Sequence, residues 1–356
     1  MNPKIKGRGP KIVVIGGGTG SSVILRGLKK YTSNITAIVT VADDGGGSGK
    51  LREDLGMLPP GDIRNCILAL ADTEPIMEQL LQYRFQEGSL KGQSFGNLFI
   101  AAMNGITGNF EEAVRQMSNV LKVEGTVIPV TLEDIILFGE LENGKIVKGE
   151  SQIPLVARQQ GQRIKKISIY PSKVAPHRYA LKAIKEADAI LLGPGSLYTS
   201  IIPNLLVDGL AEGICQSKAL KIYVSNVMTQ PGETDCYKVM DHVHAIFNHV
   251  TCSNKRAMIE YIIANSGKIP EYLIEKYRRD GSTIVSIDER KLQNNPYHFL
   301  IDDFVEIKKH YVRHNADKVA QSVVQLIAKE VLAKDQKRTL EYRNLKFLLE
   351  KEQTNK

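Results

Sequence analysis

The stretch KIVVIGGGTGSSVILRGLKKY, residues 11–31, decides the fold class. It begins with a short β-branched run, passes through a cluster of glycines and continues with apolar residues at helical spacing. Similar units of strand, glycine loop and helix follow in ADAILLGPGSLYTSIIPNLL, residues 187–206, and in ALKIYVSNVMTQPGETD, residues 219–235. Because strands alternate with helical segments, we expect a Rossmann-like α/β fold with a doubly wound, mostly parallel sheet.

The chain of 356 residues is expected to contain one nucleotide-binding domain, residues 11–334, followed by a tail. Within the domain, residues 127–156 are rich in β-branched residues around an Asn-Gly pair, which is a strong hairpin signal. We therefore expect a small antiparallel β-hairpin insertion there. Residues 62–122 read as mainly helical, with a break at Pro75.

The C-terminal end is predicted to be helical from about His314. Its last part, residues 335–356, is dense in charge, and we expect a charged tail that is helical or disordered. The tail either packs on the body of the protein or serves as a partner-binding helix.

The composition favours a globular protein with anionic partners. The net charge is +8, and 42% of the residues are hydrophobic. No apolar run reaches the roughly 20 residues that span a bilayer, and no signal peptide is recognisable, so we expect a cytoplasmic protein without a membrane span. There is no basic arm interleaved with aromatic residues, so no clear nucleic-acid site is predicted.

The cysteines and histidines do not predict a metal or catalytic centre. The four cysteines form no C-x-x-C pair, and we expect free thiols. His242 and His244 are two residues apart in a probable helix, so they point to different faces and form no zinc pair. No catalytic residue is assigned.

The first glycine loop, GGGTGSS at residues 16–22, is predicted to bind phosphate. It lies between a strand and a helix, where unpaired N–H groups and the helix dipole attract anions. Glycine allows the backbone to approach a ligand closely. The loop departs from the dinucleotide fingerprint, because Ser21 stands at the position of the last glycine. The alternative interpretation is a tight turn with no ligand.

The second glycine loop, VADDGGGSGK at residues 41–50, resembles a P-loop but does not match one. A P-loop requires Ser or Thr after Gly-Lys, whereas this chain has Leu51, and Asp44 stands where the first glycine belongs. Asp43 and Asp44 at a strand end could contact a ribose hydroxyl, or hold Mg²⁺ together with substrate phosphates. We expect one of them to cap the turn and the other to contact the ligand.

The glycines after this carboxylate pair would permit a mobile loop that folds over a bound molecule. The loop ends in PPGDIRN, residues 59–65. Asp62 is expected to cap a helix that begins near Ile63.

Further polar loops follow later strands. GPGSLYTS, residues 193–200, supplies hydroxyl groups, and Asn226 lies in the loop after the next strand. Ligands of open α/β sheets bind outside the carboxyl ends of strands, so these loops are expected to share one cleft with the first loop. Asn97, at a predicted helix start beside Gly96, is a further candidate. A solvent-facing loop is the alternative for Asn226.

The motifs resemble one family in content and order. KIVVIGGGTGSSVILRGLK, ITAIVTVADDGGGSGKLRE, PPGDIRN, GNLFIAAM, GESQIP, ADAILLGPGSLYTSIIPNLLV, SNVMTQPGETD and VRHNADKVA occur in the same order as in YvcK-type proteins. These form the gluconeogenesis-factor branch of the 2-phospho-L-lactate transferase (CofD-like) family. The resemblance runs from about residue 11 to about residue 320, and the tail is longer than expected for the family.

The resemblance implies a Rossmann-like core and a nucleotide ligand. The transferase branch binds a guanosine-linked phospholactate, and Mg²⁺ assists the transfer to a deazaflavin precursor. The YvcK branch binds UDP-sugars, notably UDP-N-acetylglucosamine, and supports cell shape and wall growth on gluconeogenic carbon sources. By motif, Tyr277 corresponds to a tyrosine near the sugar nucleotide, and Arg313 to an arginine suited to the diphosphate.

Motif interpretation and resemblance together give the candidate ligand-binding residues Gly17, Gly18, Thr19, Gly20, Asp43, Asp44, Asn97, Gly195, Ser196, Asn204, Asn226, Tyr277 and Arg313. The leading functional hypothesis is a UDP-sugar-binding regulatory protein with a role in cell shape, with homo-oligomer and cell-envelope protein partners. The alternative is a phosphotransferase in which Asp43 and Asp44 hold Mg²⁺. An NAD-dependent oxidoreductase ranks far below both, because no proton-transfer histidine is placed.

Overall fold

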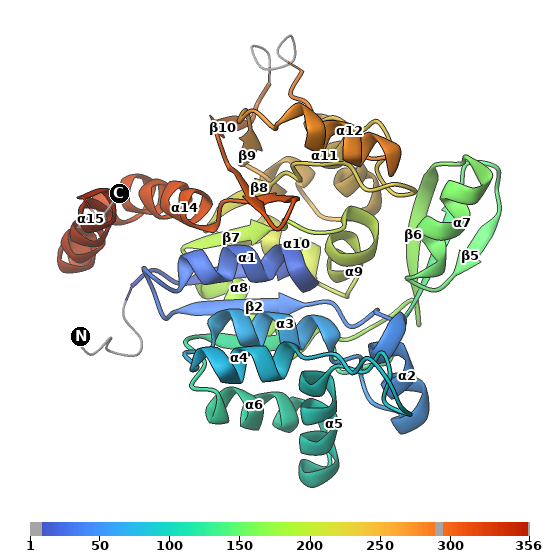
Figure 1. Ribbon diagram of the computed structural model, residues 1–356. Helices are drawn as coiled ribbons and strands as arrows, with labels where there is room; N and C mark the ends of the chain where they lie inside the picture. The colour runs from blue at the N-terminus through green and yellow to red at the C-terminus, as the bar shows by residue number, and fades with distance from the viewer. Residues whose placement is uncertain (1–8, 289–294, 355–356) are drawn as a thin grey trace.

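The computed structural model describes residues 9–288 and 295–354 and shows an α/β fold built on a seven-stranded sheet (Figure 1). All pairings in this sheet are parallel. In spatial order the strands are β10 (His298–Asp302), β9 (Tyr261–Asn265), β8 (Leu220–Val224), β7 (Ala189–Leu192), β1 (Ile12–Gly16), β2 (Ile35–Val39) and β3 (Thr126–Pro129). The predicted Rossmann-like fold is confirmed.

The direction of strand addition reverses between β1 and β7. From β1 the chain adds β2 and β3 on one side, and from β7 it adds β8, β9 and β10 on the other. Because parallel crossovers are right-handed, opposite directions of addition place the connecting helices on opposite faces of the sheet. The sheet is therefore doubly wound, and its switch point lies between β1 and β7.

Helices cover both faces of the central strands, which explains their continuous apolar runs. Every residue of β1 is buried, as expected for a strand covered on both faces. On one face α1 (Gly18–Leu28) packs against α3 (Gly61–Leu70) and α14 (Ala316–Glu330). The helices after β7 are the π-helix η1 (Leu197–Ile201), α9 (Ile202–Leu205) and α10 (Leu210–Gln216), and α10 packs against α8 (Ala180–Glu186).

The region after α3 is helical, as predicted, and α4 begins at Pro75. Its helices are α4 (Pro75–Gln82), α5 (Phe95–Thr107) and α6 (Phe110–Val120), and α2 (Gly46–Leu55) precedes α3. Figure 1 shows α5 projecting at the bottom of the molecule, away from the sheet.

The antiparallel insertion differs in extent from the predicted 127–156 hairpin. β3 belongs to the main sheet, where it pairs with β2. The insertion is a three-stranded sheet in the order β5 (Ile146–Lys148), β4 (Ile136–Leu141) and β6 (Ile164–Tyr170), with α7 (Gln152–Gln160) packed on it. The predicted turn at Asn143-Gly144 joins β4 to β5, and Gly144 has a φ of 82° there. The hairpin thus exists but gains a third strand beyond the expected boundary.

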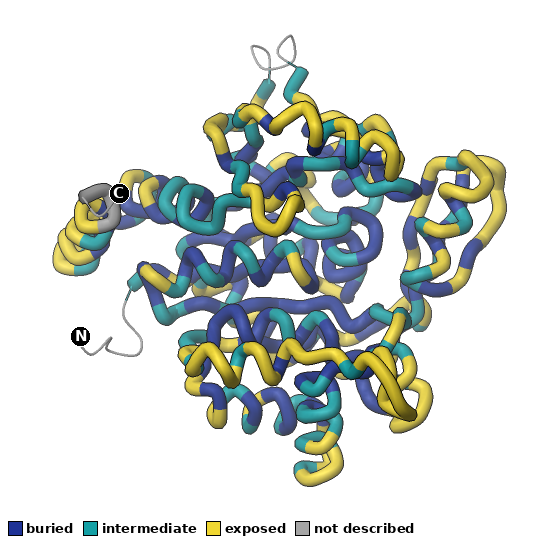
Figure 2. The backbone as a smooth tube through the Cα atoms, in the orientation of Figure 1, coloured by how far each residue is buried: buried dark blue, intermediate teal, exposed yellow. Residues whose placement is uncertain are grey.

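The C-terminal third carries two features that concern the site. The helices α11 (Val239–His249) and α12 (Glu271–Arg279) lie above the sheet in Figure 1, and β11 (Val305–Lys308) and β12 (Tyr311–His314) form a hairpin leading into α14. The charged tail forms α15 (Thr339–Thr354), whose Leu345 and Leu349 are buried. Arg338 pairs with Asp188 just before α15, so the tail docks on the body (Figure 2).

The prediction of four free thiols is wrong for two of them, because Cys215 and Cys252 form a disulfide. Cys66 is free and buried, and Cys236 is free and exposed. Nothing in the sequence spacing marks this pairing, which depends on α10 and the segment after α11 lying together. Among the described residues, none of the helices has both the length and the apolar character to cross a bilayer.

Candidate functional site

A cavity of about 580 Å³ lies at the carboxyl ends of β1 and β7, at the switch point of the sheet. This volume falls within the roughly 300–1,000 Å³ that is usual for small-molecule sites. The cavity is lined by Gly17, Gly18, Thr19, Gly20, Val23, Asp43, Asp62, Glu150, Pro194, Gly195, Ser196, Ser200, Asn226, Val227, Met228, Thr229, Gln230, Pro231, Tyr277, Asp280, Ser282, Val312, Arg313 and His314. Segments far apart in the sequence therefore share one site.

The first glycine loop forms the floor of the cavity beside the N-terminus of α1. Gly17 is the N-cap residue of α1, and its backbone is extended. No side chain caps this helix end, so N–H groups of its first turn remain open to a ligand. A methyl group on Gly20 would overlap the backbone carbonyl of Pro194. The first and third glycine loops are thus in direct contact, and only glycine fits between them.

The loop after β8 braces the loop after β7. The Asn226 side chain donates to the Gly195 carbonyl (3.0 Å) and accepts from the Gly195 N–H group (3.3 Å). Gln230 donates from Nε2 to Oγ of Ser196 (2.7 Å). These contacts fix the backbone of the β7 loop while leaving its other polar groups toward the cavity.

Glu233 supports the same loop from below. Its buried carboxylate accepts the Tyr198 N–H group (3.2 Å) and the Thr199 hydroxyl (3.3 Å). Burial raises the pKa of Glu233 to about 7, although the hydrogen bonds from Tyr198 and Thr199 oppose the shift. This carboxyl group positions the start of the helix that follows the loop.

Three carboxyl groups converge on one side of the cavity. Asp43 accepts the Gly45 N–H group (2.9 Å) through Oδ1. Burial, and then the charge of Asp43, raise the pKa of Asp62 from 3.8 to about 7. Burial, Asp43 and Glu233 raise the pKa of Glu150 to about 8. Around neutral pH, Asp62 and Glu150 are therefore at least partly protonated.

Asp62 does not cap its helix as predicted. α3 begins at Gly61 with Pro60 as its N-cap residue, so Asp62 lies within the first turn. Its carboxyl group faces the β1–α1 loop, where a methyl group on Gly17 or Gly18 would overlap it. Glycine is therefore required at positions 17 and 18 by the neighbouring carboxyl group of Asp62.

Asp44 has a structural role outside the cavity. Its two carboxylate oxygens accept the N–H groups of Glu150 and Ser151, each at 2.9 Å. These bonds fasten the insertion to the second glycine loop and carry Glu150 to the cavity wall. The expected turn cap is therefore Asp43, which accepts the Gly45 N–H group, whereas Asp44 binds the backbone of the insertion.

The carboxylate pair does not fit a metal site formed by both residues, because both Asp44 oxygens are engaged. Among the residues that the structure describes, no group of three or more His, Cys, Asp or Glu side chains is arranged to hold a metal ion. The arrangement does fit a Mg²⁺ ion held by Asp43 and by ligand phosphates, since Mg²⁺ is usually bound by one or two carboxylates plus phosphate.

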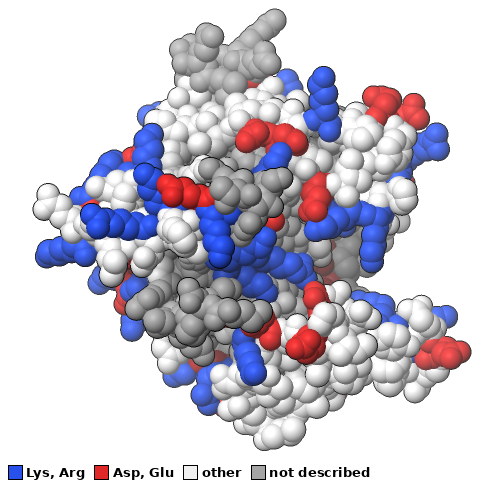
Figure 3. All heavy atoms as spheres, turned by 60° about the vertical axis from the view of Figure 1, so that its left-hand side comes forward, with Lys and Arg blue, Asp and Glu red and all other residues white. Residues whose placement is uncertain are grey.

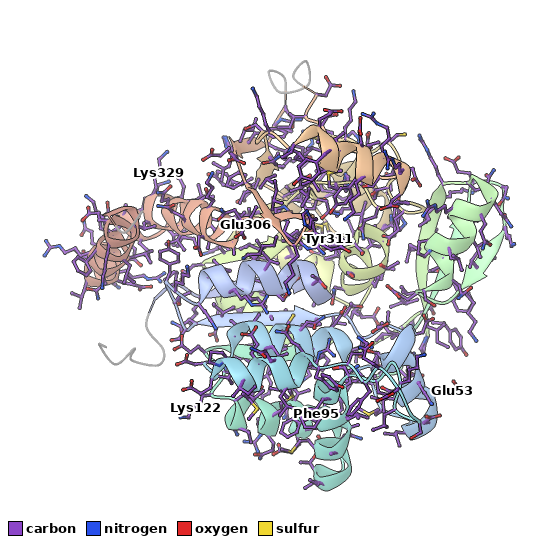
Figure 4. The ribbon with its side chains drawn as sticks, in the orientation of Figure 1. Glu53, Phe95, Lys122, Glu306, Tyr311 and Lys329 are labelled. Carbon is purple, nitrogen blue, oxygen red and sulfur yellow. A yellow bond between two sulfur atoms is a disulfide. The ribbon has the colours of Figure 1, made fainter. Side chains whose placement is uncertain are left out.

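The β11–β12 hairpin and α12 form the wall opposite the carboxyl groups. The Tyr277 hydroxyl accepts the Val312 N–H group (3.0 Å), which joins the helix to the hairpin. The Arg313 guanidinium lies 5.3 Å from the ring centre of Tyr311, which Figure 4 shows on the hairpin above α1. His314 donates to the Ser225 carbonyl (2.9 Å), and burial lowers its pKa to about 4, so it is neutral. Arg313 is the permanent positive charge of this wall.

Most predicted binding residues line the cavity: Gly17, Gly18, Thr19, Gly20, Asp43, Gly195, Ser196, Asn226, Tyr277 and Arg313. Asp44, Asn97 and Asn204 do not. Asn204 is buried below the floor and donates to the carbonyls of Gly16 and Ser200. Asn97 accepts from Arg64 (2.8 Å) at the start of α5. Both asparagines support loops from behind instead of facing the cavity.

Sequence reasoning missed several lining residues, chiefly Asp62, Glu150 and His314. Asp62 lies in the motif PPGDIRN, where it was expected to cap a helix, and Glu150 lies in GESQIP, where no role was predicted for it. His314 lies next to Arg313 in VRHNADKVA. Membership of these motifs is the sequence signal that could have identified the three residues.

Comparison with known proteins agrees with the geometry. The family described as "2-phospho-L-lactate transferase CofD" matches residues 12–305. A putative gluconeogenesis factor of Clostridium acetobutylicum is 56% identical, covering 94% of this chain and 73% of the relative. The gluconeogenesis factor of Bacillus subtilis is 47% identical, covering 90% and 99%. A crystal structure from Bacillus halodurans superposes with a TM-score of 0.83 at 46% identity, covering 88% and 99%. The chain therefore belongs to the CofD family, in its gluconeogenesis-factor branch.

Proposed function

We propose that this protein is a cytoplasmic regulatory protein that binds a UDP-sugar, UDP-N-acetylglucosamine in the first instance, and acts on cell shape and wall growth under gluconeogenic conditions. The observation that carries the proposal is the convergence of two glycine loops with Tyr277 and Arg313 on one cavity. The dimensions and polar lining of this cavity suit an extended ligand with a central diphosphate.

The two halves of a diphosphate ligand have complementary partners in the cavity. The open N–H groups at the start of α1 favour one phosphate through hydrogen bonding and the helix dipole. The guanidinium of Arg313 can pair with two oxygens of the other, because its donors form a planar fork. Hydroxyl and amide groups of Ser196, Thr229 and Gln230 supply the neutral contacts that sugar and base require.

Thermal denaturation with and without UDP-N-acetylglucosamine tests the proposal. Ligand at ten times its Kd should add about 1.4 kcal/mol to the free energy of unfolding. Arg313→Ala should remove most of this stabilisation, while Arg278→Ala, on the exposed side of α12, should retain it. Absence of any shift at millimolar ligand in the wild-type protein would contradict the proposal.

A second candidate is a Mg²⁺-dependent phosphotransferase resembling the family's transferase branch. The specific observation in its favour is the set of carboxyl groups Asp43, Asp62 and Glu150 beside the α1 N-terminus. Mg²⁺, when bound, would offset charge on a transferring phosphoryl group. Asp43 would hold the ion, and Asp62 and Glu150, with pKa values near neutrality, would hold protons next to the phosphate.

The two candidates are separated by product formation. The protein is incubated with a radiolabelled nucleotide sugar, with Mg²⁺ or with a chelator, and the nucleotides are resolved by chromatography. A Mg²⁺-dependent product that Asp43→Asn abolishes would establish the second candidate. Binding that leaves the ligand intact in both conditions would favour the regulatory role.

A further inference from the structure

A second cavity, of about 250 Å³, lies at the amino ends of β8, β9 and β10. The first residues of these three strands, Leu220, Tyr261 and His298, line it. The strands of the main sheet are parallel, so this edge lies opposite the edge where the glycine loops meet. The two cavities have no lining residue in common, and the smaller one is called the amino-edge cavity below.

Much of the lining of the amino-edge cavity is aromatic. Tyr261 and His298 are partners across the β9–β10 pair, with ring centres 5.1 Å apart and ring planes tilted by 32°. Tyr297, the residue before β10, also lines the cavity, and its ring centre lies 6.2 Å from that of Phe247. The buried side chain of Ile259 adds an apolar surface. A flat aromatic molecule can stack or pack edge to face on such rings.

The amino-edge cavity also contains a guanidinium group that has no partner. Arg256, in the 3₁₀ helix η2 (Lys255–Met258), lines the cavity. Burial raises the pKa of Tyr297, and the charge of Arg256 opposes this rise, so the guanidinium group lies near the phenol ring. Within residues 9–288 and 295–354, no hydrogen bond or ion pair engages the side chain of Arg256. Its planar set of donors is therefore available to a carboxylate.

Two acidic groups at the amino-edge cavity already have cationic partners. Glu260 lines the cavity, but its carboxylate accepts a hydrogen bond from Nζ of the buried Lys221 (3.1 Å). Burial and then the charge of Glu330 raise the pKa of Tyr261, which places Glu330 near the cavity, and Glu330 pairs with Lys334 (2.7 Å). The positive charge of the guanidinium group is thus left unbalanced, and a ligand with a negative charge would balance it.

The surroundings of the amino-edge cavity are also basic. Figure 3 brings forward the side of the molecule on which α14 and α15 lie in Figure 1, and it shows more Lys and Arg than Asp and Glu there. Glu330 is in the last turn of α14, so its influence on Tyr261 places the cavity on this side. The excess of positive charge attracts small anions to this part of the surface.

We propose that the amino-edge cavity binds a small aromatic acid, with its ring against Tyr261 and His298 and its carboxylate on Arg256. The cavity is smaller than the roughly 300–1,000 Å³ that is usual for sites of drug-sized ligands, so a molecule with one ring is expected. A carboxylate can accept two parallel hydrogen bonds from one guanidinium group. This ligand is distinct from the nucleotide sugar proposed for the carboxyl edge of the sheet, which requires the larger cavity.

Other small ligands fit the amino-edge cavity less well. An organic cation would be repelled by the unbalanced charge of Arg256. An aliphatic acid could pair with Arg256 but would not stack on Tyr261 and His298. A metal ion has no ligand set there, because the described part of the chain contains no group of three or more His, Cys, Asp or Glu side chains that could hold one.

Saturation-transfer difference NMR of the full chain, with benzoate as the probe, tests the proposal. Benzoate should bind at millimolar concentration, whereas benzamide, which lacks the charge, and cyclohexanecarboxylate, which lacks the aromatic ring, should bind more weakly. Arg256→Ala should weaken benzoate binding by about tenfold or more, because it removes charge-assisted hydrogen bonds. His298→Ala should weaken it several-fold, because it removes part of the stacking surface. Lys218→Ala is the matched control, because Lys218 is exposed and does not line the cavity, and it should bind benzoate as the wild type does.

A variant of the larger cavity separates the two sites. Arg313→Ala removes the guanidinium group of that cavity and should leave benzoate binding unchanged, whether or not a nucleotide sugar binds there. Loss of benzoate binding in Arg313→Ala would overturn the proposal, because the probe would then occupy the larger cavity. Equal binding to the wild type and to Arg256→Ala, or no binding of benzoate at millimolar concentration, would overturn it as well. Circular dichroism of each variant verifies that it is folded.

Discussion

Replacing Asp62 by asparagine should stabilise the ligand-free protein at neutral and alkaline pH but not in acid. The folded protein holds the pKa of this carboxyl group at about 7, against 3.8 for an unperturbed aspartate. Between these values the folded chain retains a proton that the unfolded chain has lost. The free energy of unfolding therefore falls as pH rises from about 4 to about 7, and stays constant above that. Asparagine resembles the protonated carboxyl group and does not titrate, so the variant does not lose this stability as pH rises.

The size of the effect follows from the shift. About three pKa units at 1.36 kcal/mol each give about 4 kcal/mol as an upper limit, because solvent at the cavity mouth screens part of it. With an unfolding entropy of about 2.1 cal/mol/K per residue, 356 residues give about 0.7 kcal/mol/K. The melting temperature of Asp62→Asn should then exceed that of the wild type by up to about 5 °C above neutral pH.

Melting curves at about pH 5 and about pH 8 measure this difference, with Asp54→Asn on the exposed side of α2 as the control. The reasoning fails if Asp62→Asn raises the melting temperature equally at both pH values, or lowers it at the higher one. An equal rise would mean that Asp62 is already ionised in the folded protein at about pH 5, and a lower melting temperature at about pH 8 would mean that its negative charge is stabilising. The same replacement should also tighten binding of a diphosphate ligand above neutral pH, because a negative charge is removed beside it.

The remaining predictions concern the architecture of the cavity. Gly20→Ala should abolish nucleotide-sugar binding in calorimetry, because its methyl group would overlap the Pro194 carbonyl, whereas Gly105→Ala has no neighbouring atom within 4 Å and should leave binding intact. Asp44→Ala removes two charged hydrogen bonds and should lower the free energy of unfolding by about 2–4 kcal/mol in denaturant titrations. In that variant, hydrogen exchange should become faster at the Glu150 and Ser151 amides.

The sequence permits the location of the site to be predicted because β1 and β7 are parallel. Their carboxyl ends must lie at one edge of the sheet, so the glycine loops that follow them meet there. Helical and strand periodicities similarly identify α1, α3 and α14 before the structure is known. These are local patterns, and a local pattern is sufficient where the fold has few ways to arrange it.

Features that depend on contacts between distant segments could not be predicted in the same way. Asp62 caps a helix or faces a cavity depending on where α1 lies, and the motif PPGDIRN is compatible with both. The choice between Asp43 and Asp44 depends on the backbone of the insertion, which begins about 90 residues later. β3 reads as part of the insertion because its partner β2 is remote in sequence. The Cys215–Cys252 disulfide could not be predicted for the same reason, because it joins segments 37 residues apart.

The charge balance of the cavity places a condition on either proposed function. Asp43, Asp62, Glu150 and Asp280 line it, against the single guanidinium of Arg313, since His314 is neutral. A diphosphate entering this space adds two negative charges, so binding at neutral pH requires compensating positive charge beyond Arg313 and the α1 dipole.

The raised pKa values of Asp62 and Glu150 allow bound protons to supply the compensating charge. This arrangement needs no metal and suits a sensor that binds and releases its ligand intact. A Mg²⁺ ion on Asp43 would supply the compensating charge instead in a transferase, because the ion also offsets charge that develops on the moving phosphoryl group. The two proposed functions therefore differ in what neutralises the diphosphate in this cavity: protons in the sensor, and a Mg²⁺ ion in the transferase.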